Sequence, residues 1–159
     1  MDWSDLIKLV HIGIAFAFVG GLLGRWILLD RAAAADDPEI AYQLAEAASP
    51  FERLVILGGP AILIAGLLTA WAQGYPWLGL TTGWMLASVV LLLSPLPLVP
   101  LVFLPRGRVF ESAMADARRL GTVTPELRAA FADPAVSVAR RYEVVAVGLV
   151  VVLMVLKPF

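Results

Sequence analysis

The chain has 159 residues, of which 60% are hydrophobic and only 16% are charged. A soluble domain has roughly 45–50% apolar and about 25% charged residues, so this composition indicates a protein whose surface faces lipid. The formal net charge of −1 argues against a nucleic-acid partner, and the absence of cysteine excludes disulfides, thiolate metal sites and a cysteine nucleophile. We therefore expect an all-α protein that is embedded in a lipid bilayer.

Four hydrophobic segments follow one another along the chain, at about 6–29, 54–72, 82–104 and 135–157. Each is long enough, as an α-helix, to cross a hydrocarbon core of about 30 Å. The expected fold is a polytopic four-helix bundle that forms a single domain over residues 1–159. The third segment contains several prolines, which predict a kinked helix whose irregular backbone faces protein rather than lipid.

Positively charged residues set the expected orientation. Ten of the twelve Lys and Arg residues, all but Lys8 and Lys157, lie in or next to the loops at 30–53 and 105–141. The positive-inside rule then places these two loops in the cytoplasm and both termini outside, in a multi-pass protein of the bacterial plasma (inner) membrane. Short amphipathic helices are expected in both loops, one of them capped by Asp37 and the other lying on the membrane surface.

The first span carries a stripe of small residues. At about 100° per residue, Gly13, Ala17, Gly21 and Gly24 fall on one side of the helix, with Gly20 close by. Small-residue stripes allow close contact between helices in membranes. We expect this face to pack against another helix, either within the chain, in a homo-oligomer or in a complex with another membrane protein.

His11 is the only histidine, and it lies inside the first span. Ionisable residues at membrane depth are usually functional, and the expected topology places Met85 and Met154 at the same depth. Imidazole and thioether groups can be the axial ligands of haem iron, so these three residues are the candidate cofactor-binding residues, with His11 as the metal ligand. In the alternative interpretation the methionines fill gaps, and His11 is hydrogen-bonded to a backbone group or to a hydroxyl such as that of Ser88.

The remaining polar groups give no pattern of catalytic residues. Arg25 lies about one turn from the cytoplasmic end of the first span, where we expect it to reach lipid phosphates or to pair with Asp30 or Glu52. The sequence contains no nucleophile–base arrangement, glycine-rich phosphate loop or carboxylate dyad. We therefore assign no catalytic residues, and we exclude a hydrolase or a kinase.

Several short motifs are spread over the whole chain: Lys8-x-x-His11 with Gly20-Gly21, then Arg53-Leu54, Thr82-Gly83-Trp84 and the ending LMVLKPF. Together they resemble a bacterial family of predicted four-span integral membrane proteins of unknown function. That resemblance implies a membrane protein but no particular activity.

The first span, KLVHIGIAFAFVGGLLGR, is similar to the first span of the four-helix membrane protoporphyrinogen oxidases, which bind haem b. The resemblance implies haem b binding through His11, with Gly21-Leu22 and, loosely, Arg25 also matching. Copper-resistance membrane domains begin in a similar way. The basic and acidic motifs that the oxidases carry near their later spans are not found here.

Three hypotheses for the function follow. The favoured one is a non-enzymatic accessory or structural subunit that packs through the small-residue face of the first span. The alternative is a haem-binding redox or haem-handling membrane protein with His11 as an axial ligand. The third is a carrier of a small molecule or a metal that uses the proline-rich third span.

Overall fold

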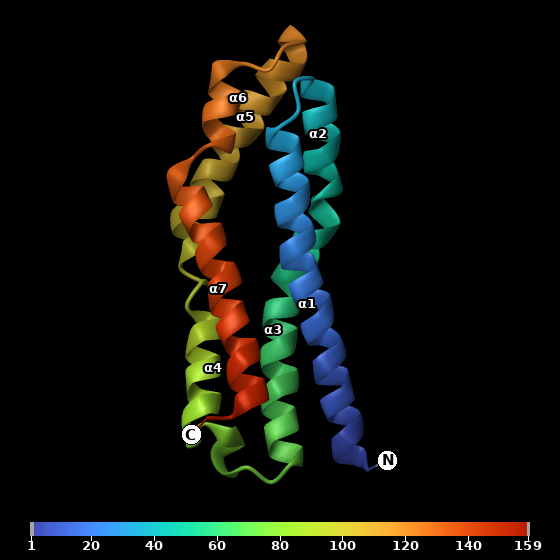
Figure 1. Cartoon of the computed structure of the whole chain (residues 1–159), viewed down its shortest axis with the longest axis vertical. Helices are drawn as coiled ribbons and strands as arrows, with labels where there is room; N and C mark the ends of the chain where they lie inside the picture. The colour runs from blue at the N-terminus through green and yellow to red at the C-terminus, as the bar shows by residue number, and fades with distance from the viewer. Residues whose placement is uncertain (1, 159) are drawn as a thin grey trace.

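The computed structural model describes residues 2–158, and these form helices with no strand (Figure 1). Two helical segments are long and apolar enough to cross a membrane. The first is α1 (Trp3–Ala33), and the second comprises α2 (Pro38–Ala47) and α3 (Ser49–Ala72). The all-α prediction is thus confirmed, and the expected spans at 6–29 and 54–72 lie inside these segments.

The second half of the chain is more interrupted. Its elements are, in order, η1 (Pro76–Gly79), α4 (Gly83–Leu93), the π-helical η2 (Val99–Phe103), α5 (Leu104–Leu120), α6 (Pro125–Phe131) and α7 (Pro134–Leu156). The expected third span at 82–104 is therefore broken after Leu93. Pro95 and Pro97 lie in the break and Pro100 lies in η2, and each removes a backbone donor that a regular α-helix would need.

The first close helix pair is α1 with α3, which lie side by side in Figure 1. A Cβ atom at Gly24 would overlap the Phe51 ring, and one at Gly21 would lie 3.0 Å from the Leu54 Cβ. These two glycines therefore let α3 approach α1 closely. By contrast, a Cβ atom added at Gly13 or Gly20 of the same stripe would have no neighbour within 4 Å.

The second close pair is α4 with α7, which runs beside the first pair in Figure 1. The two pairs meet at a buried apolar cluster formed by Phe18 and Leu22 of α1, Ile62 of α3 and Val147 of α7. Both ends of the described chain lie at the same end of the molecule, opposite α2, α5 and α6 (Figure 1). The apolar cluster divides the interface between the pairs into two halves, and each half contains a cavity.

The end of the molecule opposite the termini is closed by α2, α5 and α6. Ala113, Met114 and Ala117 of α5 pack against Ala41 of α2 and Leu127 of α6. The sequence predicted an amphipathic helix on the membrane surface in the loop at 105–141. In the structure α2 and α6 cover Ala113, Met114 and Ala117 of α5, whereas the apolar Val109 and Leu120 of the same helix are exposed.

Candidate ligand site around His11

A cavity of about 550 Å³ lies between the two helix pairs, in the half that contains the chain termini. Residues of α1, α3, α4 and α7 and of the segment between α3 and α4 line it, and most of them are apolar. His11, Met85 and Met154 all lie on its wall. The volume is within the 300–1,000 Å³ range of typical small-molecule sites. We call this space the His11 cavity.

The imidazole of His11 rests on α3 at Gly66. A Cβ atom at position 66 would lie 3.1 Å from Cε1 and 3.6 Å from Nδ1 of His11, so a larger residue there would push the ring away. The Ile62 carbonyl, one turn earlier on α3, adjoins the ring. Nδ1 is buried and makes no hydrogen bond of ordinary geometry within residues 2–158. The ring itself lies on the wall of the cavity.

The hydroxyl that could have satisfied His11 is engaged elsewhere. Ser88 lines the same cavity and is buried, but its Oγ donates to the Trp84 carbonyl at 2.7 Å. This bond runs to the preceding turn of α4, as is common for serine in apolar helices. In the described structure the only histidine therefore has no polar side-chain partner, and it lies beside a cavity.

The two methionines differ in how firmly they are packed. Met85 is 9% exposed and belongs to a buried cluster with Ala70 and Trp84, and its sulfur fills the space over Gly79. Gly79 has a φ of +79°, and this positive value together with the nearby sulfur leaves no room for a side chain. Met154 packs on the outside of the cluster and is only partly buried. Its thioether is therefore the more accessible of the two.

Lys8 and Lys157 are the charged side chains on the described wall of the His11 cavity. Lys8 is near the start of α1, and Lys157 follows the last residue of α7, so both lie towards the same end of the cavity. The Lys157 ammonium group is 5.5 Å from the centre of the Trp84 ring. The cavity therefore combines an apolar interior, one imidazole nitrogen and two cations near its end.

This set of donors fits haem better than a bare metal ion. Residues 2–158 contain no group of three or more His, Cys, Asp or Glu side chains that could hold a metal ion, as zinc would require. Haem needs one or two axial ligands from the protein and an apolar pocket. On the cavity wall, His11 offers an imidazole, Met85 and Met154 offer thioethers, and Lys8 and Lys157 offer positive charge.

One polar feature of the structure was not expected from the sequence. Arg25 of α1 forms an ion pair with Glu143 of α7, with 2.5 Å between Nη2 and Oε2. Their side chains are 12% and 10% exposed, so the pair is largely buried between the helix pairs. Arg25 therefore pairs with neither Asp30 nor Glu52. The partners are 118 residues apart, and no local sequence pattern links them.

Comparison with known proteins gives a family but no activity. Neither a curated protein nor a solved structure matches the chain. The family whose model matches is described as a predicted integral membrane protein of the DUF2269 type, and the match covers residues 5–158. It supports the resemblance to a membrane family of unknown function but not the likeness to haem or copper proteins. The chain belongs to the DUF2269 family of predicted integral membrane proteins.

Proposed function

We propose that this membrane protein binds haem b in the His11 cavity, with His11 as an axial ligand through Nε2. The observation that carries the proposal is the position of the only imidazole on the wall of this cavity. Nδ1 is buried and makes no hydrogen bond within residues 2–158, the Ile62 carbonyl adjoins the ring, and the ring lies on the wall of a largely apolar cavity. Metal-binding histidines commonly direct their second nitrogen to a backbone carbonyl, which fixes the tautomer and the ring orientation.

The other residues of the cavity suit the same ligand. Met154 offers an accessible thioether, and Met85 a second one that is more firmly packed. Lys8 and Lys157 can bind carboxylates where the cavity approaches water. Bound haem would supply one-electron chemistry. The protein's contribution would be to hold the axial ligand, exclude water and neutralise the propionates.

The proposed binding is tested by titrating hemin into detergent-purified protein and following the Soret band. We expect saturation at one hemin per chain, and a loss of affinity of at least about 100-fold for His11→Ala, as is typical when a metal ligand is removed. Ile64→Ala, on the exposed side of α3, is the matched control and should bind as the wild type does. Equal binding by the wild type and His11→Ala would refute the proposal.

For the topology, we propose that α1, α3, the α4–η2 segment and α7 cross the bacterial inner membrane as a four-helix bundle. Exposed apolar side chains on these helices support this, including Phe16 at 76%, Leu57 at 70%, Val90 at 58% and Val155 at 72%. The positive-inside rule would then place α2, α5 and α6 in the cytoplasm and both termini outside.

The orientation can be tested with single cysteines, because the natural chain has none. Ser112→Cys on α5 should react with an impermeant thiol reagent only after the inner membrane is opened. Ser4→Cys near the start of α1 should react in cells whose outer membrane alone is permeable. The reverse pattern would show that the proposed orientation is inverted.

A role as an accessory subunit is the second candidate, and one observation favours it. The part of the small-residue stripe that α3 does not cover remains open at Gly13 and Gly20, and Ala17 between them is exposed. A second membrane helix could pack there. Gly20→Leu should then dissociate a homo-oligomer or a co-purifying subunit, whereas a wild-type protein that purifies as a monomer without a partner would exclude this role.

A further inference from the structure

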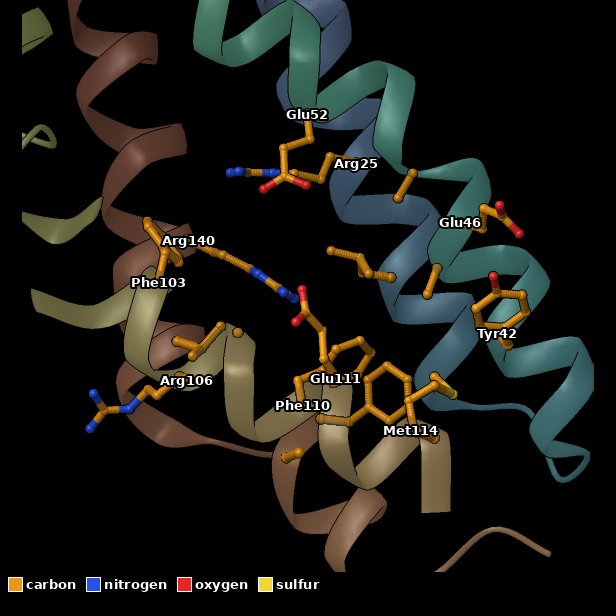
Figure 2. Close-up of a pocket in the computed structure, with 18 of the residues that line it drawn as sticks. Arg25, Tyr42, Glu46, Glu52, Phe103, Arg106, Phe110, Glu111, Met114 and Arg140 are labelled. Carbon is orange, nitrogen blue, oxygen red and sulfur yellow. The ribbon is translucent and has the colours of Figure 1, made fainter. Parts of the chain in front are cut away.

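A second cavity, of about 520 Å³, lies at the other end of the same interface, between α1–α3 and the helices α5–α7. Figure 2 shows Arg140 reaching from α7 into this space, with Arg25 and Glu52 on the side of α1 and α3 and with Phe110 and Met114 on α5. We call it the Arg140 cavity. It is separate from the His11 cavity, and no lining residue is shared between the two.

Arg140 differs from the other arginines of this cavity. Each of the others holds a carboxylate that lies outside the lining: Arg25 with Glu143, Arg106 with Asp133 and Arg118 with Glu39. Arg140 is partly buried and has no hydrogen bond or ion pair to another side chain among residues 2–158. It lies within electrostatic range of Arg25, which repels it, and of Glu143 and Glu52, which attract it without forming an ion pair with it. A partly buried guanidinium group without a partner favours an anionic ligand.

The carboxylates of the cavity limit the charge of that ligand. Glu46, Glu52 and Glu111 line it, are exposed and make no ion pair within the described part of the chain. They would repel a doubly charged phosphate monoester more strongly than a singly charged group. A phosphodiester carries one negative charge, so it suits one free guanidinium surrounded by carboxylates.

The rest of the wall is apolar and aromatic. Phe110 and Phe131 meet edge to face with 5.0 Å between their ring centres, and Met114 lies beside them on α5. The guanidinium carbon of Arg25 lies 5.8 Å from the centre of the ring of Phe103, the last residue of η2. This surface can cover the first carbons of a hydrocarbon chain next to the charged group. The chemistry of the cavity therefore matches an amphiphile rather than a fully polar anion.

We propose that the Arg140 cavity is a specific binding site for a membrane lipid with a singly charged phosphodiester head group. Arg140 binds the phosphate, the glutamates exclude more highly charged head groups, and the phenylalanines contact the start of the acyl chains. The site is independent of haem binding, because none of its residues belongs to the His11 cavity.

Native mass spectrometry of the full-length protein in detergent tests this site with three probes. Phosphatidylglycerol carries both the phosphodiester and the acyl chains, glycerophosphoglycerol carries only the phosphodiester, and diacylglycerol only the chains. We expect one tightly bound phosphatidylglycerol per chain and much weaker binding of the other two. Arg140→Gln should lower the phosphatidylglycerol affinity about tenfold, the effect of losing one charge-assisted hydrogen bond.

Arg141→Gln is the matched control, because Arg141 is the next residue of α7, is exposed and does not line the cavity. Arg141→Gln should leave the affinity unchanged, and Arg140→Lys should retain part of it. Equal losses in Arg140→Gln and Arg141→Gln would indicate non-specific lipid contact and overturn the proposal. Equal binding of diacylglycerol would also overturn it, and equal binding of glycerophosphoglycerol would assign the site to a soluble phosphodiester instead of a lipid.

Discussion

The two cavities lie in the same interface between helix pairs, but they differ in how many polar groups they contain and in how many of these have a hydrogen-bond or ion-pair partner. In the His11 cavity the polar groups are few, and the buried Nδ1 of the only histidine lacks a hydrogen-bond partner in the described structure. In the Arg140 cavity charges are abundant, and three of its four arginines already hold a carboxylate. His11 in one cavity and Arg140 in the other are thus the residues without a side-chain partner, and each proposed ligand is chosen to meet that residue: haem iron for His11 and a phosphodiester for Arg140.

The largest expected effect comes from breaking the ion pair that joins the two helix pairs. Glu143→Ala leaves Arg25 buried without its partner, which typically costs about 3–5 kcal/mol. We expect a large drop in the thermal unfolding temperature in detergent, measured by intrinsic fluorescence. Replacing both residues with leucine should restore most of the stability, whereas Glu52→Ala, at an exposed position, should change it little. A Glu143→Ala protein as stable as the wild type would show that this pair does not hold the helix pairs together.

A smaller effect should separate the two parts of the small-residue stripe. Gly24→Ala places a methyl group against the Phe51 ring, and overpacking of this kind costs about 1–3 kcal/mol. Gly20→Ala places the same methyl group in open space and should be neutral or slightly stabilising, because alanine favours helix over glycine. Thermal unfolding of the two variants side by side measures the difference. Equal stability would contradict the observed contact between α1 and α3.

Gly66→Ala tests the His11 cavity without removing the ligand. The new methyl carbon would lie 3.1 Å from Cε1 of His11, so the ring must move by a few tenths of an ångström. We expect hemin affinity to fall about fivefold, equivalent to about 1 kcal/mol, with little change in unfolding temperature. Gly59→Ala, also on α3 and without close neighbours beyond the Phe18 ring at 3.9 Å, is the control. A larger loss for Gly59→Ala than for Gly66→Ala would contradict the proposed position of the ligand.

The smallest expected effect is on the pH dependence of stability. It comes from Asp133, which lies outside the proposed spans, just before the start of α7. Burial raises the pKa of Asp133, but the N–H groups of Val136 and Ala135 and the Arg106 guanidinium together lower it more, so the pKa is below its usual value. The carboxylate therefore stabilises the fold above the unfolded-state pKa of about 3.9, and this stabilisation is lost as the pH falls through the lower folded-state value. It amounts to less than about 1 kcal/mol, because the pair with Arg106 is partly exposed.

Asp133→Asn checks this effect, because an amide oxygen can still cap the helix but does not titrate. The unfolding temperature of the variant should fall less than that of the wild type between pH 6 and pH 3. Asp116→Asn, in an exposed ion pair, is the control and should behave as the wild type does. Identical acid dependence of all three proteins would contradict the role assigned to Asp133.

The sequence predicted much of what lies along single helices. Hydrophobic length predicted the apolar helices α1 and α3, and prolines indicated the break after Leu93. Membrane depth grouped His11 with Met85 and Met154, and the structure places all three on the wall of one cavity. That these residues bind haem is still a proposal, since shared position does not establish a ligand.

Contacts between distant helices could not be read from the sequence. The Arg25–Glu143 pair joins residues 118 positions apart, and no local sequence pattern links them. Helical periodicity identified the small-residue stripe but could not show that Gly21 and Gly24 face α3 while Gly13 and Gly20 stay open. Similarly, nothing in the local sequence around Gly66 reveals that it accommodates an imidazole from another helix.

The most direct test of the central claim is the reduced-minus-oxidised visible spectrum of protein purified in mild detergent from haem-sufficient cells. If His11 holds haem b, the wild type should show a Soret band and a sharp α band with about one haem per chain. The His11→Ala protein from the same cells should be colourless while keeping its helical circular dichroism spectrum. A colourless wild-type protein that stays colourless after hemin is added would contradict the account.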